Sequence, residues 1–146
     1  GTFWYERDSG VYTELQPGSY ALMDRDYADN AATDSDIRFE HALFVYSTVM
    51  SVSHAGFVVV DAGLKSFSVD SGMPSVDGAS GLTYVRASDE HGVIATEDAH
   101  RPELGQTIRL IPGHCDPTVN LYDELVVVDE GRVVDIWPIT ARGASL

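Results

Sequence analysis

The chain has 146 residues and a formal net charge of −14, from 23 Asp and Glu residues against 9 Lys and Arg residues. Nucleic acids and anionic membranes are excluded as expected partners, because so acidic a chain repels phosphate groups. No apolar run approaches the length of a membrane-spanning helix, and the single cysteine excludes an internal disulfide, which suits a reducing compartment such as the cytoplasm.

Residues 1–20 predict an entry segment and a first strand, bounded by turn signals that contain glycine and proline. Within this segment Glu14, Gln16 and Tyr20 alternate, so their side chains would share one face of an extended backbone. An ordinary amphipathic strand explains the alternation, and we prefer that interpretation to a functional role for any one of the three.

The next segment is acidic, and its spaced aspartates invite comparison with a calcium-binding loop: Asp24, Asp26, Asp29, Asp34 and Asp36. An EF-hand loop requires glycine at its sixth position and glutamate at its twelfth. Counted from Asp24, these positions hold Asp29 and Ser35, so the pattern fails and a solvated loop is expected.

Two runs rich in β-branched and aromatic residues, 43–52 and 57–61, predict strands. Both are too apolar for a hairpin with one face in water, which indicates central strands of a sheet. Shorter strands are predicted over residues 83–86 and 92–96, with a tight turn at residues 88–92 between them.

The most informative stretch follows a strand predicted over residues 106–110, and it reads Ile111-Pro112-Gly113-His114-Cys115-Asp116-Pro117-Thr118-Val119-Asn120. In an extended backbone His114 and Asp116 would point to the same side, and Cys115 would face the other way. An imidazole nitrogen and a carboxylate oxygen that meet at one point suit a borderline-to-hard divalent cation. The sequence therefore predicts a metal site at His114 and Asp116.

A surface turn explains the same residues without a metal. Asp116 and Pro117 match the N-cap and the first position of a short helical turn over residues 118–122. If Asp116 caps that turn, one of its carboxylate oxygens is still available to a metal ion.

The chain closes with a β-hairpin predicted over residues 125–128 and 133–137, followed by a frayed tail at residues 141–146. Neither an internal repeat nor convincing helical periodicity is present in the sequence. Many short strands at regular spacing predict an all-β fold, a barrel or sandwich with short helical turns, in a single domain over residues 1–146.

The string from Gly113 to Asp123, GHCDPTVNLYD, resembles the metal-binding signature of the D-threonine aldolases. These are pyridoxal-phosphate enzymes of the alanine racemase-like fold type III, related to the D-serine dehydratases. In that superfamily a His-x-Cys or His-x-Asp pair holds the metal, so the resemblance implies His114 and Asp116 as ligands. With Asp116 at the second ligand position, the pair looks like the His-x-Asp version of the aldolases. Cys115 lies between the two ligand positions, so it does not correspond to the cysteine ligand of the His-x-Cys version.

The resemblance spans nearly the whole chain and includes the segment SGVYTELQPGSYALMDRDY at residues 9–27. It implies that this chain is the C-terminal part of a larger enzyme whose pyridoxal-phosphate-binding (β/α)-barrel is absent here. Gly1 and Thr2 resemble the tail of the loop that holds the cofactor phosphate. The Schiff-base lysine of the family lies in the barrel, so Lys65, the only lysine here, is expected at the surface.

The implied reaction is the retro-aldol cleavage of D-β-hydroxy-α-amino acids, such as D-threonine to glycine and acetaldehyde, in a homodimer. Manganese fits the carboxylate and imidazole ligands, although magnesium, cobalt and zinc suit them too. No catalytic residue beyond the metal pair is expected in this chain, so the isolated chain should be inactive. The alternatives are a D-3-hydroxyaspartate aldolase or dehydratase, a D-serine dehydratase-like enzyme, or a non-catalytic β-module that binds metal.

Overall fold

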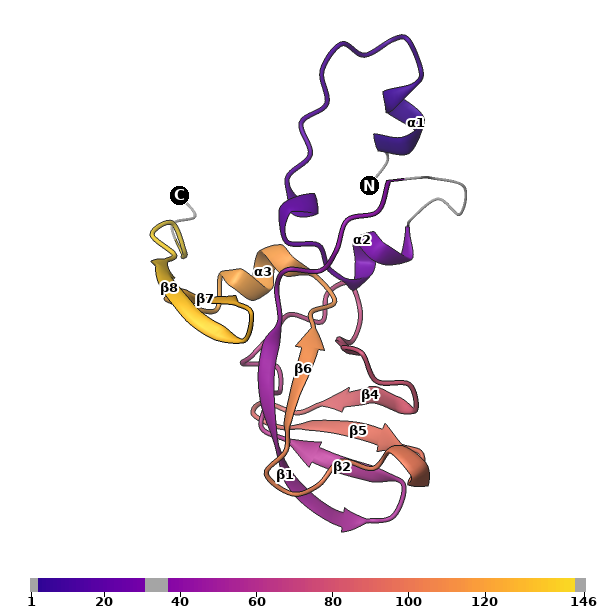
Figure 1. Cartoon of the computed structure of the whole chain (residues 1–146), viewed down its shortest axis with the longest axis vertical. Coiled ribbons are helices and arrows are strands. Elements are labelled where there is room, and N and C mark those ends of the chain that lie inside the picture. Colours follow the sequence, from indigo (N-terminus) through magenta and orange to yellow (C-terminus); the bar gives the residue numbers. More distant parts are fainter. Residues whose placement is uncertain (1–2, 31–36, 144–146) are drawn as a thin grey trace.

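The computed structural model of the chain describes residues 3–30 and 37–143, which form mostly strands and a few short helices (Figure 1). The helices are short: α1 (Phe3–Arg7), the 3-10 turn η1 (Ser19–Ala21), α2 (Arg25–Asp29), the 3-10 turn η2 (Asp98–His100) and α3 (Cys115–Val119). The strands are β1 (Val45–His54), β2 (Phe57–Val60), β3 (Ser75–Val76), β4 (Leu82–Ala87), β5 (Gly92–Thr96), β6 (Thr107–Ile111), β7 (Glu124–Asp129) and β8 (Arg132–Pro138). Within these described residues no helix is long and apolar enough to cross a membrane.

Six strands form one antiparallel sheet in the order β3-β6-β1-β2-β5-β4. The two strands at the ends of this order, β3 and β4, also lie against each other, so the sheet curls into a nearly closed barrel. Closure of this kind leaves few unpaired strand edges. The predicted all-β barrel with short helical turns is confirmed.

The strands predicted to be central, β1 and β2, occupy the middle of the sheet. Val45 and Val49 of β1 point into the core, whereas Tyr46 and Met50 on its other face are exposed. The expectation that neither face would meet water was therefore wrong for β1, which alternates as a half-buried antiparallel strand does. The core beneath it is built mainly from β-branched residues, with Phe67 and Tyr84 packed edge to face at its centre.

The prediction of a first strand within residues 1–20 was wrong. Residues 3–20 hold α1, an irregular stretch and η1, and none of these described residues belongs to a sheet. Two of the segment's alternating side chains contact each other, because Gln16 donates a hydrogen bond of 2.9 Å to Glu14.

The prediction of a solvated loop was also wrong for the first part of the acidic segment. Asp24 is completely buried, and its side chain accepts a hydrogen bond from the backbone N–H of Tyr27, so it is the N-cap of α2. An aspartate at this position satisfies a helix N–H that otherwise lacks a partner. Asp34 and Asp36 lie outside the described residues.

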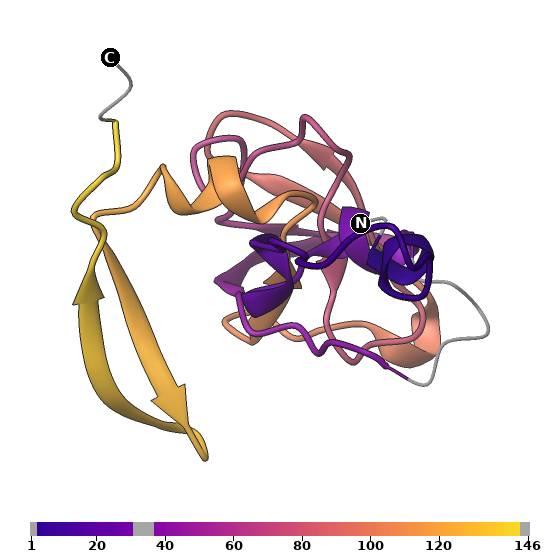
Figure 2. The same cartoon turned by 90° about the horizontal axis from the view of Figure 1, so that it is seen from above.

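The predicted C-terminal hairpin is confirmed as β7 and β8, joined by a tight turn at Glu130 and Gly131, both of which have positive φ. Figure 2 shows this hairpin projecting away from the barrel. Six large apolar side chains remain exposed on it: Val126, Val128, Val133, Val134, Ile136 and Trp137. An apolar surface of this kind is typical of an interaction surface.

Candidate metal centre

The site lies where β6 ends and the chain turns into α3. Gly113, between them, approaches the loop that follows Phe67 so closely that a Cβ atom there would lie 2.2 Å from the carbonyl oxygen of Gly72. Only glycine fits at such a close backbone contact. This contact brings residues 68–72 beside His114.

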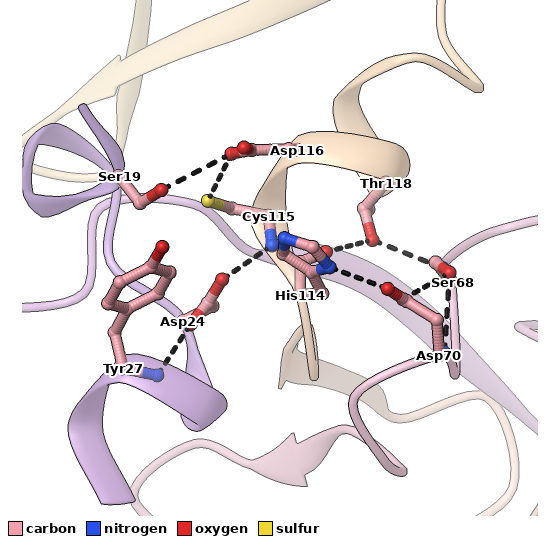
Figure 3. Close-up of polar contacts among 9 residues, drawn as sticks. All are labelled: Ser19, Asp24, Tyr27, Ser68, Asp70, His114, Cys115, Asp116 and Thr118. Atoms are coloured by element: carbon pink, nitrogen blue, oxygen red, sulfur yellow. Dashed lines mark hydrogen bonds and ion pairs between the residues drawn. The ribbon is translucent and has the colours of Figure 1, made fainter. Parts of the chain in front are cut away.

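His114 is anchored by a carboxylate from that loop. Its Nδ1 atom lies 2.7 Å from Oδ2 of Asp70 (Figure 3). The hydrogen bond and the charge of Asp70 raise the pKa of the His114 imidazole above its ordinary value, and the charges of Asp116 and Asp24 add to the effect. Hydrogen bonds from Ser68 and His114 in turn lower the pKa of Asp70.

A closed ring of hydrogen bonds holds this pair in place. Ser68 Oγ donates to Asp70 at 2.6 Å, and the backbone N–H of Ser68 donates to the Thr118 hydroxyl at 3.1 Å. The Thr118 hydroxyl donates to the His114 carbonyl at 2.7 Å and so completes the ring. Because Thr118 is buried, the ring ties the loop to α3 from the inside.

Asp116 lies on the other side of the turn. Its carboxylate is exposed and accepts hydrogen bonds from Ser19 Oγ at 3.4 Å and from the Cys115 thiol at 3.1 Å. Cys115 itself is fully buried, and burial raises the pKa of its thiol to about 12. The expectation that Cys115 would face away from the pair was wrong, because its thiol donates to Asp116. Figure 3 shows the His114 ring directed toward Asp70 and the Asp116 carboxylate directed toward Ser19.

The local backbone differs from both sequence interpretations. His114 is extended, with φ −143° and ψ 122°, but α3 begins immediately after it at Cys115. The expectation of one extended segment through both residues was therefore wrong, as was Asp116 as N-cap, because His114 takes that position. Asp116 nevertheless stays close enough to His114 for its charge to raise the pKa of the imidazole.

The N-terminal segment fixes the turn from a third direction. The second carboxylate oxygen of the buried Asp24 accepts a hydrogen bond of 2.7 Å from the backbone N–H of Cys115. The backbone N–H groups of Arg25 and Asp26 donate to the carbonyls of Pro112 and Gly113, each at 3.1 Å. The start of α2 therefore forms hydrogen bonds with both ends of the Pro112–Cys115 turn.

The donor types at this site, an imidazole nitrogen and a carboxylate oxygen, suit a divalent ion. Because an ionised carboxylate only accepts hydrogen bonds, Asp70 requires a proton on Nδ1 of His114, so the neutral ring keeps its lone pair on Nε2. The exposed Asp116 carboxylate supplies the oxygen donor. In residues 3–30 and 37–143, no group of three or more His, Cys, Asp or Glu side chains is placed to hold a metal.

The other residues named from the sequence lie away from this turn or outside the described residues. Lys65 is exposed and pairs with Glu90 at 2.7 Å, as expected for a surface lysine. Gly1 and Thr2, expected to contact the cofactor phosphate, lie outside the described residues. Asp24 and Asp70 were missed as parts of the site, because no local pattern links either of them to a histidine far along the chain.

Comparisons with known proteins agree with the barrel fold. A family model described as a putative serine dehydratase domain matches residues 42–128. The chain is 52% identical to a D-threonine aldolase from Arthrobacter sp. over 99% of its length, and 46% identical to a 3-hydroxy-D-aspartate aldolase from Paracoccus denitrificans over 98%. The crystal structure of a D-threonine aldolase from Filomicrobium marinum superposes on the whole chain with a TM-score of 0.93 and 48% identity.

These relatives are much longer than this chain. The chain spans 38% of the length of each of the two aldolases and 40% of the crystallised one. The match therefore covers part of a longer protein in each case.

Proposed function

Since this chain belongs to the putative serine dehydratase domain family, within the fold type III pyridoxal-phosphate enzymes, we propose that it is the metal-binding domain of a D-threonine aldolase. The reaction proposed is the cleavage of D-threonine, or of a similar D-β-hydroxy-α-amino acid, to glycine and an aldehyde. The observation that carries the proposal is the His114–Asp116 turn, with Nδ1 of His114 already engaged by Asp70, in a chain 52% identical to such an aldolase.

His114 and Asp116 are proposed as the two protein ligands of a divalent ion, for which manganese is the first candidate. When bound, the ion supplies Lewis acidity toward a substrate hydroxyl group, and pyridoxal phosphate supplies an electron sink. Asp70 holds the proton on Nδ1 of His114, so that Nε2 is the nitrogen that binds. The buried Cys115 thiol is proposed to lie outside the ligand set.

The cofactor is proposed to reside in a barrel domain of the same enzyme, with Gly1 and Thr2 at the edge of its phosphate site. The exposed apolar surface of the β7–β8 hairpin supports contact with a further domain or a second subunit, and a homodimer is proposed. A cytoplasmic location is proposed from the single cysteine. The isolated chain is proposed to be inactive, because it supplies the metal ligands without the cofactor lysine.

A second candidate, cleavage of D-3-hydroxyaspartate, is favoured by the 46% identity to the Paracoccus aldolase. The two substrates share the β-hydroxyl group and differ in the second carboxylate of hydroxyaspartate. Their relative rates of cleavage would decide between them.

A chimera tests the proposal. In it, this chain replaces the matching segment of the Arthrobacter D-threonine aldolase, and acetaldehyde release from D-threonine is measured with and without Mn²⁺. The proposal predicts manganese-dependent cleavage that His114→Ala and Asp116→Ala abolish, while the exposed His91→Ala leaves the rate unchanged. A chimera that retains cofactor absorbance and cleaves D-threonine equally well with either ligand replaced would contradict it.

A further inference from the structure

We infer that Asp70 is a positioning residue of the metal centre, which selects the Nδ1–H tautomer of His114 and holds its ring in the orientation that presents Nε2. The inference rests on the proposed metal site. It adds a residue 44 positions away from His114 in the sequence, on a loop outside the signature string.

The contact between the two side chains has the geometry of a charge-assisted hydrogen bond. Its length is 2.7 Å, and it joins the Nδ1 edge of His114 to a carboxylate that has no proton to donate. A neutral imidazole bonded in this way must place its single proton on Nδ1. None of the described residues forms a hydrogen bond with Nε2, which therefore remains available as a lone-pair donor.

The carboxylate is itself oriented. One of its oxygens accepts from Ser68 Oγ at 2.6 Å and the other from His114, so each has a defined partner. The backbone of Ser68 is fixed by the buried Thr118 hydroxyl, which also binds the His114 carbonyl. Rotation of Asp70 away from His114 would break this ring, which includes the backbone of His114 itself.

A close backbone contact explains why the loop that carries Asp70 lies beside the turn. Gly113 allows the backbone at Gly72 to approach the turn, so Asp70 reaches His114 without an intervening water. A carboxylate that hydrogen-bonds the second nitrogen of a ligating histidine fixes the ring and raises its basicity, and its loss weakens metal binding about 10- to 100-fold.

The test uses Asp70→Asn in the full chain, because asparagine keeps the size of the side chain and removes its charge. Free Mn²⁺ is followed by electron paramagnetic resonance during titration of each variant, with Asp129→Asn at the exposed end of β7 as the matched control. We expect Asp70→Asn to weaken Mn²⁺ binding about 10- to 100-fold and Asp129→Asn to leave it unchanged. Ser68→Ala, which keeps the charge but frees the carboxylate, should weaken binding less.

A second measurement needs no metal. Two-bond ¹⁵N–¹H correlation spectra, recorded above the pKa of His114, report which imidazole nitrogen carries the proton. The wild-type ring should be the Nδ1–H tautomer, and Asp70→Asn should shift it toward Nε2–H. Failure of the wild-type chain to bind Mn²⁺ would overturn the proposed metal site, whereas an unchanged tautomer and unchanged affinity in Asp70→Asn would overturn the role of Asp70.

Discussion

The buried carboxylate of Asp24 accepts a hydrogen bond of 2.7 Å from the backbone N–H of Cys115, a residue 91 positions later in the chain. Its other oxygen caps α2 through the backbone N–H of Tyr27 at 2.9 Å. One side chain thus accepts from an N–H group in the first turn of α2 and from the first N–H group of α3, and α3 carries the candidate metal ligand Asp116.

Replacement of Asp24 should therefore destabilise the fold at both helices. Asp24→Asn retains one acceptor and should lower the free energy of unfolding by about 1–2 kcal/mol, and Asp24→Ala should cost more because both N–H groups lose their partner. Urea denaturation measures the difference. Asp26→Asn, on the same helix but outside the core, should unfold like the wild type. Equal unfolding midpoints for Asp24→Ala and Asp26→Asn would refute this role.

Gly113 should tolerate no side chain. Gly113→Ala places a Cβ atom 2.2 Å from the Gly72 carbonyl oxygen, so the loop must move, and overpacking of this kind costs about 1–3 kcal/mol. The displaced loop should also carry Asp70 away from His114 and weaken Mn²⁺ binding. Gly18→Ala is the control, since its Cβ would meet nothing within 4 Å. The two variants can be compared by thermal unfolding and by metal titration, and equal behaviour would disprove the close contact.

The Cys115 thiol should be inert in the folded chain. It is fully buried and its pKa is raised to about 12, so little thiolate exists near neutral pH, and thiolate is the reactive form. A disulfide reagent such as Ellman's should label no thiol in the native state and one per chain in urea. Cys115→Ala should leave the Mn²⁺ affinity unchanged. A loss of Mn²⁺ affinity in this variant would show that Cys115 contributes to metal binding.

Alkaline pH should destabilise the fold through Tyr84. Its hydroxyl donates to the Ala62 carbonyl at 2.7 Å, and burial raises its pKa from 10.0 to about 12. Because the folded-state pKa is higher, the unfolded chain releases this proton first, so stability present below pH 10.0 is lost as the pH rises through about 12.

Tyr84→Phe has no such proton, so its unfolding midpoint should depend less on pH across this range. The exposed Tyr46→Phe variant should follow the wild type. If Tyr84→Phe and the wild type lose stability in parallel above pH 10.0, the buried hydroxyl is not the cause.

The sequence carried enough local information for most of the strands. β-branched runs predicted β1, β2 and the hairpin, because strand pairing follows side-chain patterns of short range. The start of α3 was misplaced because its first N–H is capped by Asp24 from a distant segment and not by Asp116 nearby. The role of Asp70 was missed for the same reason, since only the folded backbone at Gly113 and Gly72 brings it to His114.

Calorimetric titration of Mn²⁺ into the full chain tests the central claim most directly. We predict one Mn²⁺-binding site in the wild type, lost in His114→Ala and in Asp116→Ala, and retained in the exposed control variants His91→Ala and Asp129→Ala. Binding of Mn²⁺ with wild-type affinity after either ligand is replaced would contradict the assignment of His114 and Asp116 as the metal centre.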